Sequence, residues 1–574
     1  MSVTWVVGES LMAACPVCDA PGPHTVTLRS GAHTLLRCGG CTGCFYLDRV
    51  RPDYGADQPS ELFNQVYVEQ NAGLHYMTRF LWQFDDPGMS SMLDVGCGFG
   101  FSVDVADKVL GWRAIGIDPS HYARDGRAML GADIRRAYLT EETALGEPFD
   151  LIVAVEVIEH IPDLYPFLAL LRRWMTAGAR LVFTTPNADG LSPEVDEGML
   201  FAMLSAGGHL VLFNAASMEL MLRRAGFQHV RCEASGPNLV VYASDVPLRF
   251  RADAEAAHFA GYTAYLRRLL ETAESGHPLW NGAAGRLMAV EAEGAPVETV
   301  LALFARVAEA WRARFGIDIA RRRLPPPVPE GEFGTPGPAL LHRMCVTQPL
   351  NLGGVLYQRA VLERRLPGRI PEAVLGFARA AYAVAQQTSR ALDEYGLIDG
   401  DLKNTVWRAR MLCTDMLVEL TPELEGPLLA ALAGPSPGGL AGRIDPPAAL
   451  LIAHIAPFFV RHVHVNSYDE ALRFEPLLAD LDVTVGALQG TRMELFHTLF
   501  CLGALRLNAL DAPEGALAAF QRLAAVAEAE LASPAATDLA HHFAGVARAH
   551  VAIALARIAP PAAAPRVSRR RAAS

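Results

Sequence analysis

SMLDVGCGFGF, residues Ser91–Phe101, is the most informative segment of the sequence. Its apolar beginning predicts a strand that ends at Asp94, after which Gly96, Gly98 and Gly100 alternate before a helix-like stretch. Glycine has no Cβ, so it lets the backbone turn sharply and lets a ligand contact main-chain atoms. The first N–H groups of the following helix are also free to bind a ligand. The segment therefore predicts a ligand-binding turn between a strand and a helix.

The spacing of these glycines separates two kinds of ligand. A dinucleotide-binding turn has the pattern G-x-G-x-x-G, whereas this sequence has G-x-G-x-G followed by Phe101. About twenty residues further on, AIGIDPS at 114–120 predicts a second strand that ends at Asp118. A carboxylate at that place can accept hydrogen bonds from the cis hydroxyls of a ribose. The pair of signals predicts a nucleoside-binding crevice, with a dinucleotide as the poorer fit.

The surrounding sequence has the rhythm of a parallel sheet covered by helices. Between about residues 60 and 245, short apolar runs alternate with longer helix-like segments, as in βαβ units. The candidate strands are residues 92–95, 114–117, 151–155, 180–184 and 239–242. After about residue 245 the strand signal fades, and apolar residues at three- and four-residue spacing predict amphipathic helices.

Five of the ten cysteines lie between positions 15 and 44. Cys15 and Cys18 form one C-x-x-C pair, and Cys38, Cys41 and Cys44 offer two overlapping choices for a second pair. Two such pairs about twenty residues apart are typical of a tetrahedral zinc ribbon. A full set of four thiolates leaves no open position on the metal, so the predicted zinc is structural.

Composition divides the chain into six predicted parts. They are a zinc-ribbon-like module (1–55), an α/β domain (56–245), a helical extension (246–322), a Pro-rich linker (323–340), an α-helical domain that could be repeat-like (341–558) and a disordered basic tail (559–574). No pattern of about 34 residues recurs in the helical half, so a formal repeat assignment is weak.

Charge and hydropathy exclude some partners. The chain has 574 residues, with 62 acidic and 50 basic side chains and a formal net charge of -12. Nucleic acids and anionic membranes prefer a basic surface, so we expect neither as the main partner. No stretch reaches the ~18–20 apolar residues of a membrane span, and residues 1–14 lack a basic leader. We therefore expect a cytoplasmic protein.

Five ordered blocks resemble the class I S-adenosylmethionine (SAM)-dependent methyltransferases of the small-molecule and glycan branch. They are LDVGCGFG (93–100), GIDPS (116–120), FDLIVAVEVIEHIPD (149–163), LVFTTPN (181–187) and GHLVLFNAASMELMLRRAGF (208–227). The resemblance implies a Rossmann-like α/β fold, a seven-stranded, mostly parallel sheet with one antiparallel strand. SAM would lie at the carboxyl ends of the first strands. The implied SAM-binding residues are Asp94, Gly96, Cys97, Gly98, Gly100, Asp118 and Pro119.

The segment Glu156-Val-Ile-Glu159-His160 follows the predicted fourth strand, where it would face the donor methyl. Methyl transfer is an in-line displacement that requires alignment of donor and acceptor and often deprotonation of the acceptor. His160 could act as the general base because imidazole titrates near neutral pH. His209, in the loop before the last helix block, is a second candidate.

The same residues allow two other interpretations. Glu156, Glu159 and His160 with a later His resemble the E-x-x-E-H-plus-His metal site of small-RNA 2′-O-methyltransferases, and a similar arrangement occurs in ubiquinone-pathway O-methyltransferases. A Mg²⁺ or Mn²⁺ ion there would hold two acceptor oxygens and lower their pKa. In other relatives with E-H-I-P the Glu only orients a loop, so a structural role stays open.

The resemblance also bears on the zinc ligands. FYL follows Cys44, as aromatic residues often follow the last cysteine in the N-terminal zinc modules of glycan and deoxysugar methyltransferases. We therefore prefer Cys15, Cys18, Cys41 and Cys44 as the ligands, with Cys38 as the alternative.

Three functions remain to be compared. The first is a SAM-dependent methyltransferase that acts on a hydroxyl, or as second choice a carbon, of a sugar, glycan or secondary metabolite; this acceptor class rests on the resemblance alone. The second is an inactive methyltransferase-fold scaffold that binds protein partners through its helical C-terminal half. The intact Asp94, Gly96, Gly98 and Asp118 argue against it. The third, a nicotinamide-dependent reductase, fits the glycine spacing poorly.

Overall fold

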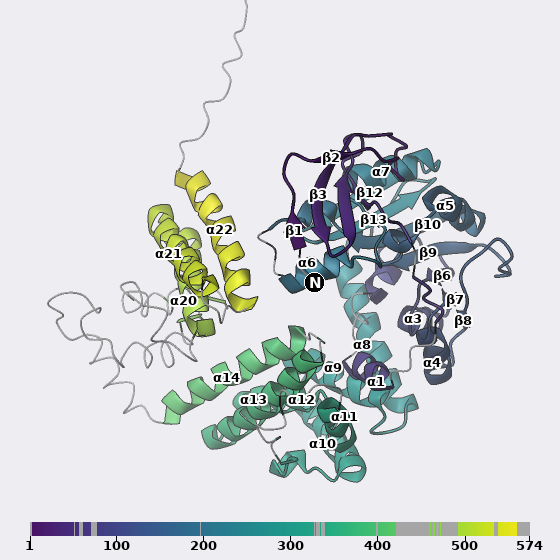
Figure 1. Cartoon of the computed structure of the whole chain (residues 1–574). Coiled ribbons are helices and arrows are strands. Elements are labelled where there is room, and N and C mark those ends of the chain that lie inside the picture. Colours follow the sequence, from purple (N-terminus) through teal and green to yellow (C-terminus); the bar gives the residue numbers. More distant parts are fainter. Residues whose placement is uncertain are drawn as a thin grey trace, which may run out of the picture. The chain divides into compact units, whose positions relative to one another are not determined.

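The computed structural model describes most of the chain and divides it into two compact units (Figure 1). The described residues are 3–50, 52–56, 61–70, 77–193, 195, 197–326, 328, 333, 339–395, 397, 400–420, 459–460, 463–464, 468, 471, 492–532 and 538–558. Unit 1 comprises Met1–Pro193 and Met199–Cys413, and unit 2 comprises Glu194–Gly198 and Thr414–Ser574.

The predicted seven-stranded sheet is the centre of unit 1. Its order is β12-β13-β10-β9-β6-β7-β8. Neighbouring strands from β10 to β8 are parallel, whereas β13 runs antiparallel to both of its neighbours. The mostly parallel sheet with one antiparallel strand is thus confirmed. The strands are β6 (Ser91–Val95), β7 (Arg113–Asp118), β8 (Ile134–Arg136), β9 (Phe149–Val155), β10 (Met175–Pro186), β12 (His229–Ser235) and β13 (Asn238–Ser244).

Helices cover both faces of the sheet, as is usual for parallel strands, and the central strands are therefore buried on both sides. All five residues of β6 are buried. Helices α5 (Leu164–Arg173) and α7 (Ala215–Arg224) share a hydrophobic core with one face, which includes Leu93, Ile152 and Phe183. The remaining helices of the α/β part are α3 (Phe101–Lys108), α4 (His121–Leu130) and α6 (Glu197–Leu204), with short 3₁₀ helices η1 (Arg79–Trp82), η2 (Ile158–His160) and η3 (Ala188–Gly190).

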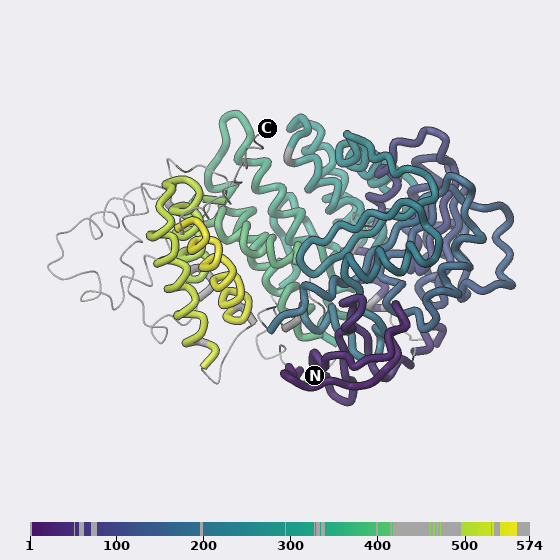
Figure 2. Tube along the Cα trace, turned by 90° about the horizontal axis from the view of Figure 1, so that it is seen from above, coloured from purple at the N-terminus to yellow at the C-terminus, as the bar shows by residue number. Residues whose placement is uncertain are grey.

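The N-terminal strands form a second sheet that is continuous with the α/β part (Figures 1 and 2). Its order is β1-β3-β4-β5-β11, with β2 paired to β3. Its last strand, β11, comes from the block after His209 and not from the N-terminal segment. Val26 and Phe45 also share a core with Leu93 and Phe213. The strands are β1 (Val3–Trp5), β2 (Ser10–Leu11), β3 (His24–Ser30), β4 (His33–Arg37), β5 (Cys44–Tyr46) and β11 (Val211–Leu212).

The rest of unit 1 is helical, as predicted. Helix α12 packs against α9, α10 and α13, so helices from both sides of residues 323–340 belong to one unit. Most of that Pro-rich stretch lies outside the described residues. The helices are α1 (Glu61–Gln70), α8 (Ala254–Thr272), α9 (Pro278–Gly294), α10 (Val297–Phe315), η4 (Ile319–Arg321), α11 (Ala339–Thr347), α12 (Leu352–Arg365), α13 (Pro371–Glu394) and α14 (Gly400–Leu420).

Three helices make up the well-described part of unit 2. They are α20 (Arg492–Asn508), α21 (Pro513–Leu531) and α22 (Asp538–Ile558), and each packs on the other two. Phe520 lies fully buried between them. The predicted tail, residues 559–574, and most of residues 421–491 lie outside the described residues. Among the helices that the structure describes, none combines the length and the apolarity that a membrane crossing requires.

Candidate functional site

The glycine turn lies between β6 and α3, as predicted, and its conformation requires glycine. Gly96, Gly98 and Gly100 have φ angles of 76°, 53° and 77°, a left-handed region that other residues rarely adopt. A Cβ at Gly96 would lie 2.4 Å from Val157, and one at Gly100 would lie 2.3 Å from Ile134. At Gly98 no atom would lie within 4 Å of a Cβ. Gly98 therefore faces open space, where a ligand can approach the main chain.

Asp118 ties this turn to the end of the neighbouring strand. One carboxylate oxygen accepts a hydrogen bond from the Gly98 amide at 3.0 Å, and the other accepts one from the Ser120 amide at 2.8 Å. Oδ1 also accepts a bond from the Ser120 hydroxyl, so Oδ2, which accepts from the Gly98 amide, is the oxygen that keeps a lone pair for a ligand. Asp94 lies below the turn and accepts a bond from the Ser102 hydroxyl. Burial raises the pKa of Asp94 to about 7.

The predicted SAM-binding residues thus lie together at the adjacent ends of β6 and β7, with one distinction. The Cys97 sulfur is buried and packs against Gly116 of β7, where an added Cβ would lie 2.6 Å from it. Only the main chain of Cys97 is available to a ligand. Pro119 follows Asp118, and its carbonyl accepts a bond from Arg136.

Three aromatic rings cover one side of the turn. Tyr67 of α1 stacks on Phe99 with centroids 5.1 Å apart and an interplanar angle of 22°, and it also stacks on Tyr122 of α4. Burial raises the pKa of Tyr67, and the charges of Tyr122 and Asp118 contribute. The helix before the sheet therefore places a ring against the glycine turn.

Glu159, His160 and His209 form a buried cluster. Their ligand atoms all lie within 4.8 Å of one another, and both histidine Nε2 atoms lie 4.0 Å from Oε1 of Glu159. Glu159 is 0% exposed, and neither of its carboxylate oxygens accepts a hydrogen bond. Burial raises the pKa of Glu159 well above its ordinary value, and the charge of Glu156 adds to the shift. Such a carboxylate is costly unless a cation or a donor approaches it.

The two imidazoles are oriented by hydrogen bonds to main-chain carbonyl oxygens. Nδ1 of His209 lies 2.8 Å from the Met203 oxygen, and Nδ1 of His160 lies 3.0 Å from the Gly208 oxygen. A carbonyl oxygen only accepts, so each Nδ1 must donate and each Nε2 lone pair faces Glu159. Burial lowers the pKa of both rings, that of His209 to about 4. Neutral imidazoles held in this way are typical metal ligands.

Tyr54 completes the surroundings of His160, and we assigned it no chemistry from the sequence. Its hydroxyl lies 2.7 Å from Nδ1 of His160 and 3.4 Å from the Gly208 carbonyl oxygen, to which it donates. The residue lies in a segment without a motif, between the cysteine-rich region and α1. No spacing in the sequence connects it to His160, 106 positions away.

Glu156 lies beside this cluster but is not one of the three residues that form it. Its φ angle is 55°, and its Oε1 accepts a hydrogen bond from the Thr184 hydroxyl at 2.7 Å. Its amide donates to the Thr184 carbonyl oxygen at 3.0 Å. Glu156 is therefore held by β10 at the end of the sheet.

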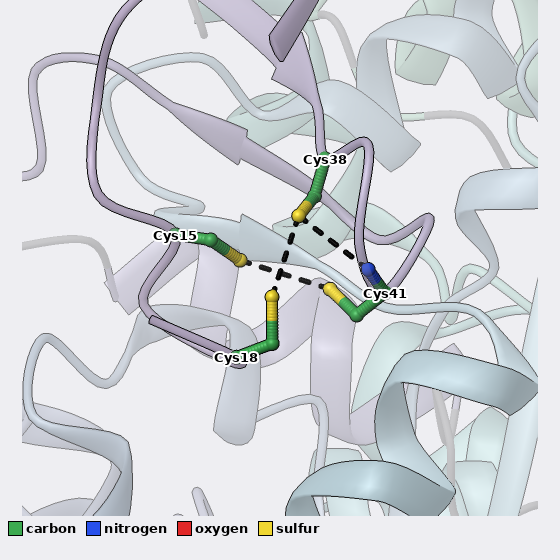
Figure 3. A group of neighbouring side chains, drawn as sticks. All are labelled: Cys15, Cys18, Cys38 and Cys41. Carbon is green, nitrogen blue, oxygen red and sulfur yellow. Dashed lines mark hydrogen bonds between the residues drawn. The ribbon is translucent and has the colours of Figure 1, made fainter. Parts of the chain in front are cut away.

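Four cysteine sulfurs converge in the N-terminal sheet (Figure 3). Sγ of Cys15 lies 3.7 Å from Sγ of Cys41, and Sγ of Cys18 lies 3.5 Å from Sγ of Cys38. Zinc–sulfur bonds of about 2.3 Å in a tetrahedron place sulfurs about 3.8 Å apart. The four sulfurs therefore have the spacing of a tetrahedral zinc site.

The two C-x-x-C turns share one backbone design. In each, the amide four residues after the first cysteine donates to that cysteine's carbonyl: Asp19 to Cys15 at 3.0 Å, and Thr42 to Cys38 at 3.1 Å. Asp19 and Thr42 both have positive φ angles, 60° and 64°. The amide of Cys41 lies 3.5 Å from Sγ of Cys38, and such N–H groups stabilise a thiolate.

The structure contradicts our preference for Cys44, because Cys38, the alternative, completes the group of four sulfurs. Cys44 begins β5, where it pairs with Arg37 of β4 and Leu212 of β11. Its side chain is fully buried outside the cluster. The aromatic residues after Cys44, on which we based the choice, form this strand and not the zinc-binding turn.

Comparisons with known proteins agree with this geometry. Residues 69–231 match a family model described as a methyltransferase domain. These residues are therefore a methyltransferase domain, and its fold is that of the class I enzymes.

Individual relatives match only part of the chain. A ubiquinone biosynthesis O-methyltransferase of Rhodopseudomonas palustris (strain TIE-1) is 34% identical over 127 residues, which are 21% of this chain and 46% of the relative. One from Bradyrhizobium sp. (strain ORS 278) is 30% identical over 129 residues, again 21% and 46%. The chain thus spans about half the length of the curated relatives it matches. A solved SAM-dependent methyltransferase from Archaeoglobus fulgidus is 17% identical with a TM-score of 0.27, covering 32% of this chain and 99% of that one.

Alanine substitution at two glycines with similar φ angles should destabilise the protein by different amounts. Gly100→Ala places a methyl group against Ile134, whereas Gly131→Ala, with φ of 67°, meets no atom within 4 Å. Both changes carry the strain of a left-handed alanine, about 1–2 kcal/mol. Gly100→Ala should lose about 1–3 kcal/mol more through overpacking.

Thermal unfolding followed by calorimetry, with SAM absent, measures both variants. Equal destabilisation would mean that the contact with Ile134 does not constrain the turn.

Proposed function

We propose that the protein is a SAM-dependent methyltransferase that transfers a methyl group to a hydroxyl of a small molecule. The observation that carries this proposal is the open glycine turn at Gly98, tied to Asp118 at the end of the next strand. A hydroxyl acceptor is supported by the relatives, which are O-methyltransferases by name. A sugar, a glycan or a secondary metabolite is the acceptor class that the sequence resemblance implies.

The residues of the crevice fit SAM. The main chain of Gly96, Gly98 and Gly100 can approach the ligand closely because no Cβ intervenes, and Asp118 can accept bonds from ribose hydroxyls. SAM supplies the electrophilic methyl group, and the chain aligns it with the acceptor. A dinucleotide fits less well. Its pattern, G-x-G-x-x-G, has two residues between the second and third glycines, whereas this sequence has one.

We further propose that Glu159, His160 and His209 hold a divalent cation, Mg²⁺ or Mn²⁺, on the acceptor side. They offer one carboxylate and two neutral imidazoles, and the cation would compensate a carboxylate that is buried without a hydrogen bond. It would lower the pKa of a bound hydroxyl. Without a cation, Nε2 of His160 is the group that could accept the proton, so a general base is the alternative.

For the cysteine cluster we propose structural zinc bound by Cys15, Cys18, Cys38 and Cys41. The spacing of the sulfurs and the paired turns support this metal. Four thiolate ligands close the coordination sphere, so the ion would stabilise the fold without taking part in the reaction.

The proposal predicts that the purified protein binds SAM and that Asp118→Ala weakens binding about 10- to 100-fold. The variant loses the ribose acceptor, and charge-assisted bonds contribute about 1.5–3 kcal/mol. Calorimetric titration measures the affinity, with Asp133→Ala, an exposed carboxylate, as the control. A protein that binds NAD(P)H and not SAM, or neither, would contradict the proposal.

Metal analysis separates the two choices for the zinc ligands. Cys38→Ser should lose zinc, because it removes one of the four converging sulfurs. Cys44→Ser changes a buried cysteine outside the cluster and should keep about one zinc per chain. Mass spectrometry of the metal content of both proteins decides the matter. Zinc retained in Cys38→Ser and lost in Cys44→Ser would restore our first choice.

Manganese titration tests the second metal site. After dialysis against a chelator, the protein should bind one Mn²⁺, detected by electron paramagnetic resonance. Glu159→Gln should abolish this binding, since it removes the one charged ligand. Glu147→Gln, at an exposed position, should leave it unchanged. Turnover that resists the chelator, with no Mn²⁺ bound, would leave His160 as the base.

A further inference from the structure

Leu210 connects the N-terminal sheet to the cluster of Glu159, His160 and His209. The Leu210 carbonyl oxygen accepts a hydrogen bond from the Tyr46 amide at 3.0 Å, and the Leu210 amide donates to the Glu159 carbonyl oxygen at 2.7 Å. Leu210 follows His209 directly. The main chain of β5 is thus two hydrogen bonds away from the main chain of Glu159.

The side chain of Tyr46 forms a second link to the same site. It is 1% exposed, and its hydroxyl donates to the Leu204 carbonyl oxygen at 3.0 Å. Leu204 ends α6, and the preceding residue, Met203, supplies the carbonyl that orients His209. Tyr46 therefore fixes the segment whose carbonyl determines how the His209 imidazole points.

The second cysteine turn is also anchored beside this segment. Asn214 donates a hydrogen bond to the Thr42 hydroxyl at 2.9 Å. A Cβ on Gly43 would lie 2.8 Å from the Ser217 hydroxyl, so the turn packs directly on the start of α7. Asn214 and Ser217 form the capping box of that helix. The block 208–217 is therefore held along its length by residues that follow Cys38 and Cys41.

We propose that the zinc module is part of the acceptor-side site, with Tyr46 as a positioning residue for His209 and Glu159. This inference rests on the proposed function, and it adds that the four-cysteine centre controls the geometry of the second metal site. Only four residues separate Cys41 from Tyr46, so a turn fixed by a metal also fixes β5. Small segments of this kind commonly rely on a bound metal for part of their stability.

A disturbance of the zinc module should affect segment 203–212 and not the glycine turn. The glycine turn is held by β6, β7 and α3: Gly98 donates to Asp118 of β7, and Ser102 of α3 donates to Asp94 of β6. The segment 203–212 is paired instead with β5. If the zinc module loses its order, residues 203–212 should therefore become more mobile, while SAM binding persists.

Two tyrosines whose hydroxyls each donate to a main-chain carbonyl, Tyr46 and the partly buried Tyr165, allow a test in the full-length protein. Tyr46→Phe removes the bond to Leu204. Tyr165→Phe removes a bond from helix α5 to the Val17 carbonyl in the first cysteine turn, which does not reach His209. Amide hydrogen exchange of residues 203–212 should accelerate about tenfold in Tyr46→Phe, as expected for loss of a buried hydrogen bond. It should stay unchanged in Tyr165→Phe.

Binding measurements on the same proteins give the second readout. Tyr46→Phe should weaken Mn²⁺ binding about tenfold and leave SAM affinity within twofold, because only the acceptor side is disturbed. Cys38→Ser should accelerate exchange in residues 203–212 more strongly than Tyr46→Phe, while residues 91–100 keep their protection.

The outcomes separate this inference from the proposed function. Unchanged exchange in residues 203–212 of Tyr46→Phe overturns the inference, and so does faster exchange that extends equally to residues 91–100. If the wild type binds neither SAM nor Mn²⁺, the proposed function fails, whereas the exchange comparison still decides whether Tyr46 holds the segment. If Cys38→Ser does not fold, the two tyrosine variants decide the question alone.

Discussion

The hydrogen bond from the Gly98 amide to the Asp118 carboxylate is the interaction on which the crevice depends. The Gly96 amide also donates to the Ile117 carbonyl oxygen at 2.8 Å, so the turn is tied to the neighbouring strand at two points. The bond from Gly98 uses one lone pair of Oδ2 to fix the turn and leaves the second lone pair of that oxygen for a ligand. The Asp118 carboxylate therefore fixes the turn and can also bind a ligand. The turn is sterically possible because its glycines adopt positive φ angles.

A second constraint is electrostatic. Glu159 is fully buried, and it faces two imidazoles whose pKa values burial lowers. Without a proton or a cation, a carboxylate in such surroundings opposes folding. The cluster lies beside the end of β9. In the proposed enzyme the donor would bind at the turn between β6 and α3, and the acceptor would bind at this cluster.

Residues close together in sequence were predictable, and pairings across distant segments were not. The glycine turn and Asp118 follow from local spacing, and the mostly parallel sheet with one antiparallel strand follows from the family resemblance. The choice of Cys44 failed because an aromatic strand and an aromatic zinc flank look alike in sequence, and only the pairing of β5 with β11 distinguishes them. Tyr54 and Tyr46 carry no motif, since their partners His160 and Leu204 lie 106 and 158 positions away. Glu156 belongs to the motif, but its φ angle and its bond to Thr184 draw it toward β10.

The shared sheet has a consequence for anyone who dissects this chain. A boundary placed at residue 55 looks natural in composition, yet an excised α/β domain would carry β11 as an open edge beside Leu210 and Phe213, both of which are buried in the intact protein. Exposed edges with apolar neighbours recruit other chains and promote aggregation. Insolubility of such a fragment would therefore report the missing neighbour strand and would say nothing about the fragment's capacity for chemistry.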